Sequence, residues 1–101
     1  MKIKILESAL EDIKKGRDFY EQQKEGLGSY FVDNIILDIE SLKYFAGIHQ
    51  KVFSEYHRLL SRKFPFAIYY KIIENNIIVF AVLDCRQNPQ KTEKRLKEKN
   101  D

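Results

Sequence analysis

The chain has 101 residues, of which 44% are hydrophobic and 33% charged, and its formal net charge is +3. This length suits one globular domain with a single core, and the lone cysteine, Cys85, excludes an intramolecular disulfide. The longest apolar run, residues 77–83, is far shorter than the roughly 20 residues of a membrane helix. Residues 1–6 show no secretory signal pattern, so we expect a cytoplasmic protein with no membrane association.

The charge is distributed unevenly along the chain. Residues 1–50 carry a net charge of −2, whereas residues 51–101 carry +5. A basic half suits an acidic partner, and a solvated surface with uneven ion pairs explains the same numbers equally well.

The N-terminal segment predicts a strand followed by a helix. Polar and apolar residues alternate over residues 2–6, which is the period of a half-buried strand. Ser8 and Glu11 have the spacing of a capping box and predict a helix over residues 9–23. Gly16 lies on the apolar stripe of this helix, where glycine costs roughly 1 kcal/mol relative to alanine. We therefore expect a second helix to approach closely at Gly16.

A second helix and a set of strands follow. After a break at residues 26–29, an amphipathic pattern predicts a helix over residues 30–45, antiparallel to the first. Residues 47–55 have no regular pattern. The period then changes to two, and the strands that this predicts cover residues 56–62, 66–73 and 77–83. Residues 74–76 form a turn, since asparagine tolerates positive φ. The last strand is apolar on both faces, which indicates an interior strand.

The C-terminal segment is highly charged. Residues 90–101 contain Leu96 as their only apolar residue, so we expect a mobile charged tail or a short helix without a core face. We accordingly divide the chain into a domain at 1–89 and this tail at 90–101. Cys85 is interpreted as a small buried hydrophobe of the preceding strand.

The predicted element order is β-α-α-β-β-β, which places the chain in the α+β class. A helical hairpin followed by a β-meander packs both helices on one face of a small antiparallel sheet. We expect the first strand to join this sheet at an edge.

Three motifs follow the two predicted helices in a defined order. They are YHRLL at residues 56–60, FPFAIYY at 64–70 and VLDCRQNP at 82–89. Together they resemble the RelE/ParE family, the toxins of bacterial type II toxin–antitoxin (plasmid stabilisation) modules, and the resemblance covers essentially the whole chain. It implies the fold described above, inhibition of growth and a cognate antitoxin as partner. A homodimer and a toxin–antitoxin hetero-oligomer are both compatible with it.

The resemblance leaves two mechanisms open. ParE-like members inhibit DNA gyrase by binding, whereas RelE-like members cut mRNA on the ribosome without a metal. Cleavage requires a base, an acid and cations near the phosphate, and the residues that offer these groups here are His57, Arg58, Lys63 and Arg86. RelE-like members commonly carry a tyrosine or histidine near the C-terminus, and this chain has none after Tyr70. The ParE-like branch is therefore favoured. A non-toxic protein-interaction domain of the same fold is a third alternative.

Basic residues are the expected contacts for the antitoxin or the target. These are Arg58, Arg86, Lys91, Lys94 and Arg95, although a solvated tail is an equally good reading of the last three. Asp84 is expected to pair with Arg58 or Arg86. Phe66 and Tyr70 are expected to be structural. We interpret His49 as a solvated loop residue and His57 as a surface residue, with proton transfer as the alternative for His57.

Neither a metal nor a cofactor is expected. No cysteine–histidine pair has the spacing of a zinc site, and the short Gly-Leu-Gly segment at residues 26–28 does not follow a strand as a phosphate-binding loop would.

Overall fold

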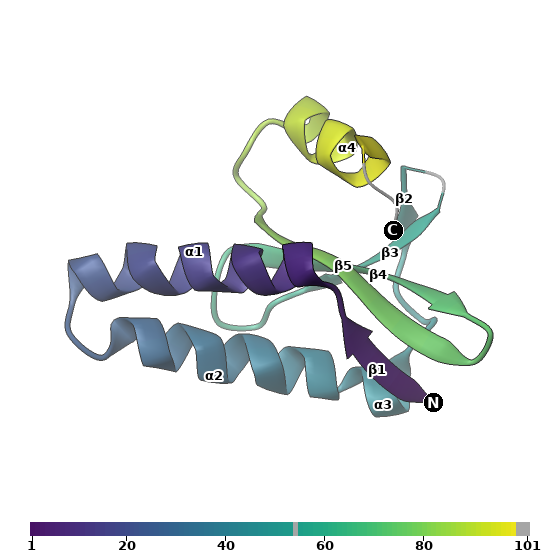
Figure 1. Cartoon of the computed structure of the whole chain (residues 1–101), viewed down its shortest axis with the longest axis horizontal. Coiled ribbons are helices and arrows are strands. Elements are labelled where there is room, and N and C mark those ends of the chain that lie inside the picture. The colour runs from purple at the N-terminus through teal and green to yellow at the C-terminus, as the bar shows by residue number, and fades with distance from the viewer. Residues whose placement is uncertain (54, 99–101) are drawn as a thin grey trace.

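The computed structural model describes residues 1–53 and 55–98. The elements in chain order are β1 (Lys2–Ile5), α1 (Glu7–Gln23), α2 (Leu27–Glu40), α3 (Leu42–Phe45), β2 (Lys51–Val52), β3 (Tyr56–Leu60), β4 (Phe66–Ile73), β5 (Asn76–Asp84) and α4 (Pro89–Glu98). The α+β class and the helical hairpin on one face of a sheet are confirmed, and Figure 1 shows this arrangement.

The sheet has five strands in the order β1-β5-β4-β3-β2. The pairs from β2 to β5 are antiparallel, as expected for a meander. β1 joins at the edge, as expected, but it pairs with β5 in parallel, from Lys2 opposite Asn76 to Ile5 opposite Val79. The sheet is therefore mixed. The reason is topological: the helical hairpin carries the chain from one edge to the other, and the meander brings β5 back in the direction of β1.

Each face of the sheet carries its own core. The larger core lies between the sheet and the α1–α2 hairpin and includes Phe31, Ile35 and Val79, all fully buried. The smaller core lies on the other face and includes Phe80 and Leu96. Alternate residues of β4 enter alternate cores, because successive side chains of a strand point to opposite faces. Figure 1 shows α4 on the side of the sheet away from α2.

The helix starts differ from those predicted. α1 begins at Glu7 after Leu6, and its start has no side-chain cap. The capping box predicted at Ser8 and Glu11 is wrong, because the Ser8 hydroxyl donates a hydrogen bond to the Phe80 carbonyl of β5. α2 begins at Leu27, three residues before the predicted start, after Gly26 with a φ of 89°.

The region between the hairpin and β3 also differs. The predicted helix over residues 30–45 is divided at Ser41 into α2 and α3. The segment expected to be irregular contains β2, which pairs with the start of β3. The turn before β5 is confirmed, since Glu74 and Asn75 have φ values of 49° and 65°, the left-handed conformation of a two-residue hairpin loop.

Two expectations for the C-terminal part are wrong. The segment after residue 89 has a core face, because Leu96 and Thr92 of α4 are only 3% and 5% exposed. Cys85 lies beyond the end of β5 and is exposed rather than buried. Residues 99–101 of the predicted tail lie outside the described residues.

The close approach at Gly16 is confirmed. A Cβ atom there would lie 2.5 Å from Cε2 of Phe31, a buried ring of α2. The α1–α2 packing distance therefore requires glycine at this position.

We expect Gly16→Ala to lower the free energy of unfolding by about 1–3 kcal/mol, since the clash with Phe31 outweighs the higher helix propensity of alanine. Urea unfolding measures the change. Lys14→Ala, on the exposed side of α1, serves as the control and should have little effect. In a Phe31→Leu background, which removes the clashing ring atoms, Gly16→Ala should lower the free energy of unfolding by less. Equal or greater stability of Gly16→Ala would contradict the role assigned to the glycine.

Candidate functional site

Among residues 1–53 and 55–98, no strand pairs with the end of β5 on its β1 side, and α1 covers that edge instead. β1 pairs with β5 only as far as residue 79. Beyond it, the Phe80 carbonyl accepts a hydrogen bond from the Ser8 hydroxyl at 3.3 Å, and the Val82 amide donates to Oδ2 of Asp12 at 3.0 Å. Side chains of α1 thus take the place of a strand, so that these buried backbone groups are paired.

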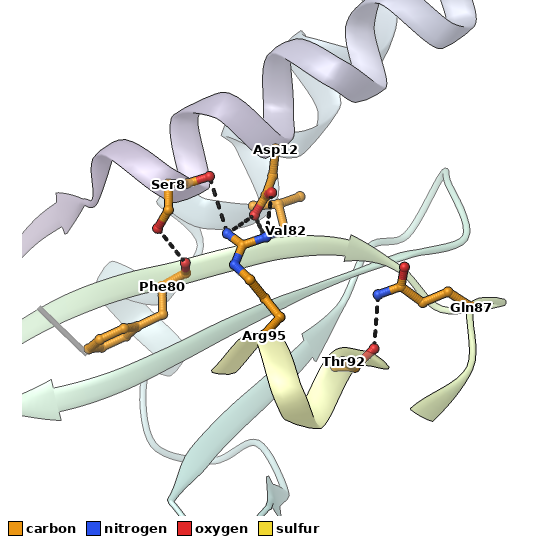
Figure 2. A network of polar contacts seen from close by, with 7 residues as sticks. All are labelled: Ser8, Asp12, Phe80, Val82, Gln87, Thr92 and Arg95. Carbon is orange, nitrogen blue, oxygen red and sulfur yellow. Dashed lines mark hydrogen bonds and ion pairs between the residues drawn. The ribbon is translucent and has the colours of Figure 1, made fainter. Parts of the chain in front are cut away.

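Asp12 also holds α4 through Arg95, and Figure 2 shows the network. Nη1 of Arg95 lies 2.8 Å from Oδ1 of Asp12, and Nη2 lies 2.7 Å from Oδ2. Nη2 also donates to the Ser8 carbonyl at 3.3 Å. The Asp12 side chain is 6% exposed and that of Arg95 29%. A two-pronged pair of this kind is stronger and more directional than a neutral hydrogen bond, so it positions α4 against α1 and β5.

Apolar and neutral polar contacts also pack α4 against the sheet. Leu96 is buried in the smaller core, and its carbonyl accepts a hydrogen bond from the Tyr56 hydroxyl at 2.8 Å. Gln87 donates through Nε2 to the Thr92 hydroxyl at 3.0 Å. The side chains of Lys91 and Lys94 are exposed on the outside of α4. The helix therefore presents a basic outer surface while its inner surface closes one face of the sheet.

Sequence reasoning missed Asp12 and Tyr56. Thr92 and Leu96 are one helical turn apart, and this spacing was the available sign that α4 has a buried side. The sequence offered a weaker indication that Asp12 is buried: this charged residue adjoins the apolar stripe of α1.

Arg58 lies in β3 on the α4 side of the sheet, beside Tyr69. A small cavity of about 70 Å³ adjoins it and is also lined by Cys85 and Gln87. Burial raises the pKa of Tyr69, and partial desolvation beside the cavity raises that of the Cys85 thiol, while the Arg58 cation opposes both shifts. A cavity of this size accommodates a few water molecules and is much smaller than sites for drug-sized ligands.

Arg86 follows β5 and pairs with Asp84, one of the two partnerships considered from the sequence. Nε of Arg86 lies 2.9 Å from Oδ1 of Asp84, and Nη2 lies 2.7 Å from Oδ2. The pair is partly solvated, since the Arg86 side chain is 62% exposed. The hydrogen bonds from Arg86 lower the pKa of Asp84. Because of this pairing, Arg86 is held close to the end of β5.

His57, which precedes Arg58 in the YHRLL motif, faces the larger core rather than α4. The His57 ring stacks on Tyr70, with ring centroids 5.0 Å apart, and its Nδ1 donates to the His49 carbonyl at 2.8 Å. Tyr70 is fully buried in the larger core, as Phe66 nearly is. Lys63 is exposed in the β3–β4 connection. His57 and Arg58 are consecutive residues of one strand and lie on opposite faces of the sheet. The four residues considered for catalysis are therefore not brought together.

His49 is not the solvated loop residue that was expected. It is half-buried, and its Nδ1 lies 2.5 Å from the Tyr70 hydroxyl. That hydroxyl also accepts the Gly47 amide at 2.9 Å. Burial lowers the pKa of His49, and the neighbouring His57 contributes to the shift. Both histidines therefore pack against one buried tyrosine.

Comparison with known proteins supports the fold. A chain of the solved structure described as "Chromosomal ParDE TA system from P. aeruginosa" aligns with a TM-score of 0.75 over 83% of this chain and 95% of that one. The sequence identity is 18%. The chain therefore has a ParE-like fold, and the resemblance inferred from the motifs is confirmed at the level of the fold. No family model matches the sequence, and the search of curated proteins finds no match.

Two further properties concern the described residues. None of their helices is long and apolar enough to cross a membrane. They contain no group of three or more histidine, cysteine, aspartate or glutamate side chains that could hold a metal ion.

We expect Asp12→Ala to destabilise the protein by about 1–3 kcal/mol, because the buried Val82 amide and Arg95 both lose their acceptor. Arg95→Ala should also destabilise the protein, since the buried Asp12 carboxylate keeps its hydrogen bond from the Val82 amide but loses its ion pair. Chemical denaturation measures the change in the free energy of unfolding of each variant. Hydrogen exchange should show faster exchange of the α4 amides in both. Unchanged exchange in α4 would mean that the pair does not hold this helix.

We expect stability to fall as the pH drops from about 7 to about 5. The pKa of His49 is lower in the folded chain than its ordinary value of 6.5. As the pH falls, His49 therefore binds a proton in the unfolded chain at a higher pH than in the folded chain, so protonation of His49 favours unfolding. Urea midpoints measured across this range should fall for the parent and fall less steeply for His49→Gln. Parallel curves for the two proteins would contradict the assignment to His49.

Proposed function

We propose that the chain is the toxin of a type II toxin–antitoxin module and that it acts by binding a target rather than by cleaving RNA. The ParE-like fold supports the first part, since a chain of a ParDE system shares it. Such a module would act in the cytoplasm and would serve plasmid stabilisation or a related role.

The separation of the candidate catalytic residues supports the second part. Metal-independent RNA cleavage needs a base, an acid and a cation around one phosphate. His57 packs on Tyr70 in the larger core, whereas Arg58 lies on the face covered by α4. Arg86 is paired with Asp84 at the end of β5. A target-binding toxin needs no such convergence, and DNA gyrase is the target that the family resemblance suggests.

The proposed partner is an antitoxin with an acidic segment. Arg86, Lys91 and Lys94 are exposed cations at the end of β5 and on the outside of α4. Complementary charge of this kind steers association and orients the partner. Arg58 is a secondary contact because it lies under α4, and Arg95 is already engaged by Asp12. A non-toxic interaction domain of the same fold is the remaining alternative.

Induced expression in a bacterial host tests the proposal, with mRNA integrity and plasmid supercoiling measured in the same culture. We expect growth arrest with intact transcripts and disturbed supercoiling. Cleaved transcripts would instead establish the ribonuclease alternative. Absence of arrest at confirmed expression of folded protein would contradict the toxin proposal.

The basic surface should matter for the antitoxin. We expect Lys91→Glu with Lys94→Glu to weaken binding of the cognate antitoxin by about tenfold or more, which is ~1.4 kcal/mol. Isothermal titration calorimetry measures the affinity. Lys14→Glu with Lys15→Glu, on the opposite helix layer, is the matched control and should bind as the parent does. Equal affinity for both double variants would remove α4 from the interface.

A further inference from the structure

Large apolar side chains are exposed on α2, on α3 and in the segment that follows α3, beside a hollow next to β3. Leu37 is 55% exposed, Phe45 53% and Ile48 73%. Ser41, one helical turn after Leu37, leads into a hollow of about 390 Å³. The residues that line this hollow are Asp38, Ser41, Phe45, Ile48, His49, Leu59 and Arg62. Single exposed apolar residues are common, but several of them near one hollow indicate a binding surface.

The two sides of this surface, here called its banks, carry opposite charge: Asp33 and Glu40 lie on one bank and Arg62 on the other. Asp33 and Glu40 lie four residues before and three residues after Leu37, so they flank it on one side of α2. Both are exposed, and neither forms a salt bridge among the described residues. The other bank carries Arg62, whose side chain is 77% exposed although its Nε lies 3.5 Å from Asp38. The surface is therefore acidic, apolar and basic in turn from one bank to the other.

We propose that a second copy of this chain binds this surface, about a two-fold axis that runs parallel to α2. Rotation about such an axis faces the acidic bank of each copy with Arg62 of the other, and it brings the two Leu37 side chains together. A two-fold axis across α2 would instead oppose acidic bank with acidic bank, and the repulsion disfavours that arrangement. The order of charges thus selects a dimer in which the α2 helices are parallel.

The apolar part supplies the driving force for this dimer. Leu37, Phe45 and Ile48 are each more than half exposed in the single chain, and covering such side chains removes apolar area from water. The opposed banks supply orientation more than affinity, because exposed ion pairs contribute little. This surface is separate from α4 and from Arg86, so the dimer does not depend on the proposed toxin function.

Analytical ultracentrifugation of the purified chain tests the proposal over a wide range of concentration. We expect a reversible dimer whose dissociation constant rises about tenfold or more in Asp33→Lys with Glu40→Lys. Adding Arg62→Glu to that variant should restore much of the affinity, since the two banks are then exchanged. Glu11→Lys with Asp18→Lys has the same charge change at the same spacing on α1 and should dimerise as the parent does.

A cysteine cross-link tests the geometry of the dimer without changing Arg62. The test therefore holds even if the variant that contains Arg62→Glu fails to fold. With Cys85→Ser as background, Leu37→Cys should form a disulfide-linked dimer under mild oxidation, whereas Lys15→Cys on α1 should not. A parent that is monomeric at every concentration would overturn the proposal and leave this surface to a different protein. So would a dimer that none of the charge variants affects, because its interface would then lie elsewhere.

Discussion

Asp12 of α1 is the point at which three distant parts of the chain meet. Its carboxylate accepts the Val82 amide of β5 and both terminal nitrogens of Arg95 from α4. Burial of a carboxylate is costly unless its oxygens are fully engaged, and here both oxygens are. The interaction exists because β1 is too short to cover β5, so that a helix side chain must satisfy the free strand edge. Once that carboxylate is in place, it provides the charge that holds α4 over the second face of the sheet.

This arrangement gives the sheet two covered faces with different properties. The hairpin face is a large aromatic and aliphatic core in which Tyr70 gathers both histidines of the chain. The α4 face has a smaller core and a basic outer surface. Because neighbouring residues of β3 point to opposite faces, His57 and Arg58 belong to different environments although they adjoin in the sequence. The side chains of these two residues therefore cannot converge on one phosphate.

Local patterns were reliable where a single element determines the outcome. Alternation over residues 66–73 predicted β4 and its two faces correctly, and the apolar stripe of α1 predicted a close helix contact at Gly16. Patterns failed where a distant group competes for the same atoms. Ser8 has the spacing of a helix cap, yet its hydroxyl bonds to Phe80. His49 looks like a solvated loop residue, yet its ring is half-buried and contacts the Tyr70 hydroxyl. Periodicity contains no information about such partners.

The amino-acid sequence by itself determined the element order, the α+β class and the division of apolar residues between helix stripes and strand faces, because these follow from periods of 3.6 and 2 along the chain. Only the tertiary structure decided the parallel pairing of β1, the seat of α4 and the partners of the charged residues. Asp12 and Arg95 are separated by most of the chain, and their contact depends on where β1 stops and how α1 crosses the edge of β5. Those distances arise from packing, so no local spacing could have predicted them.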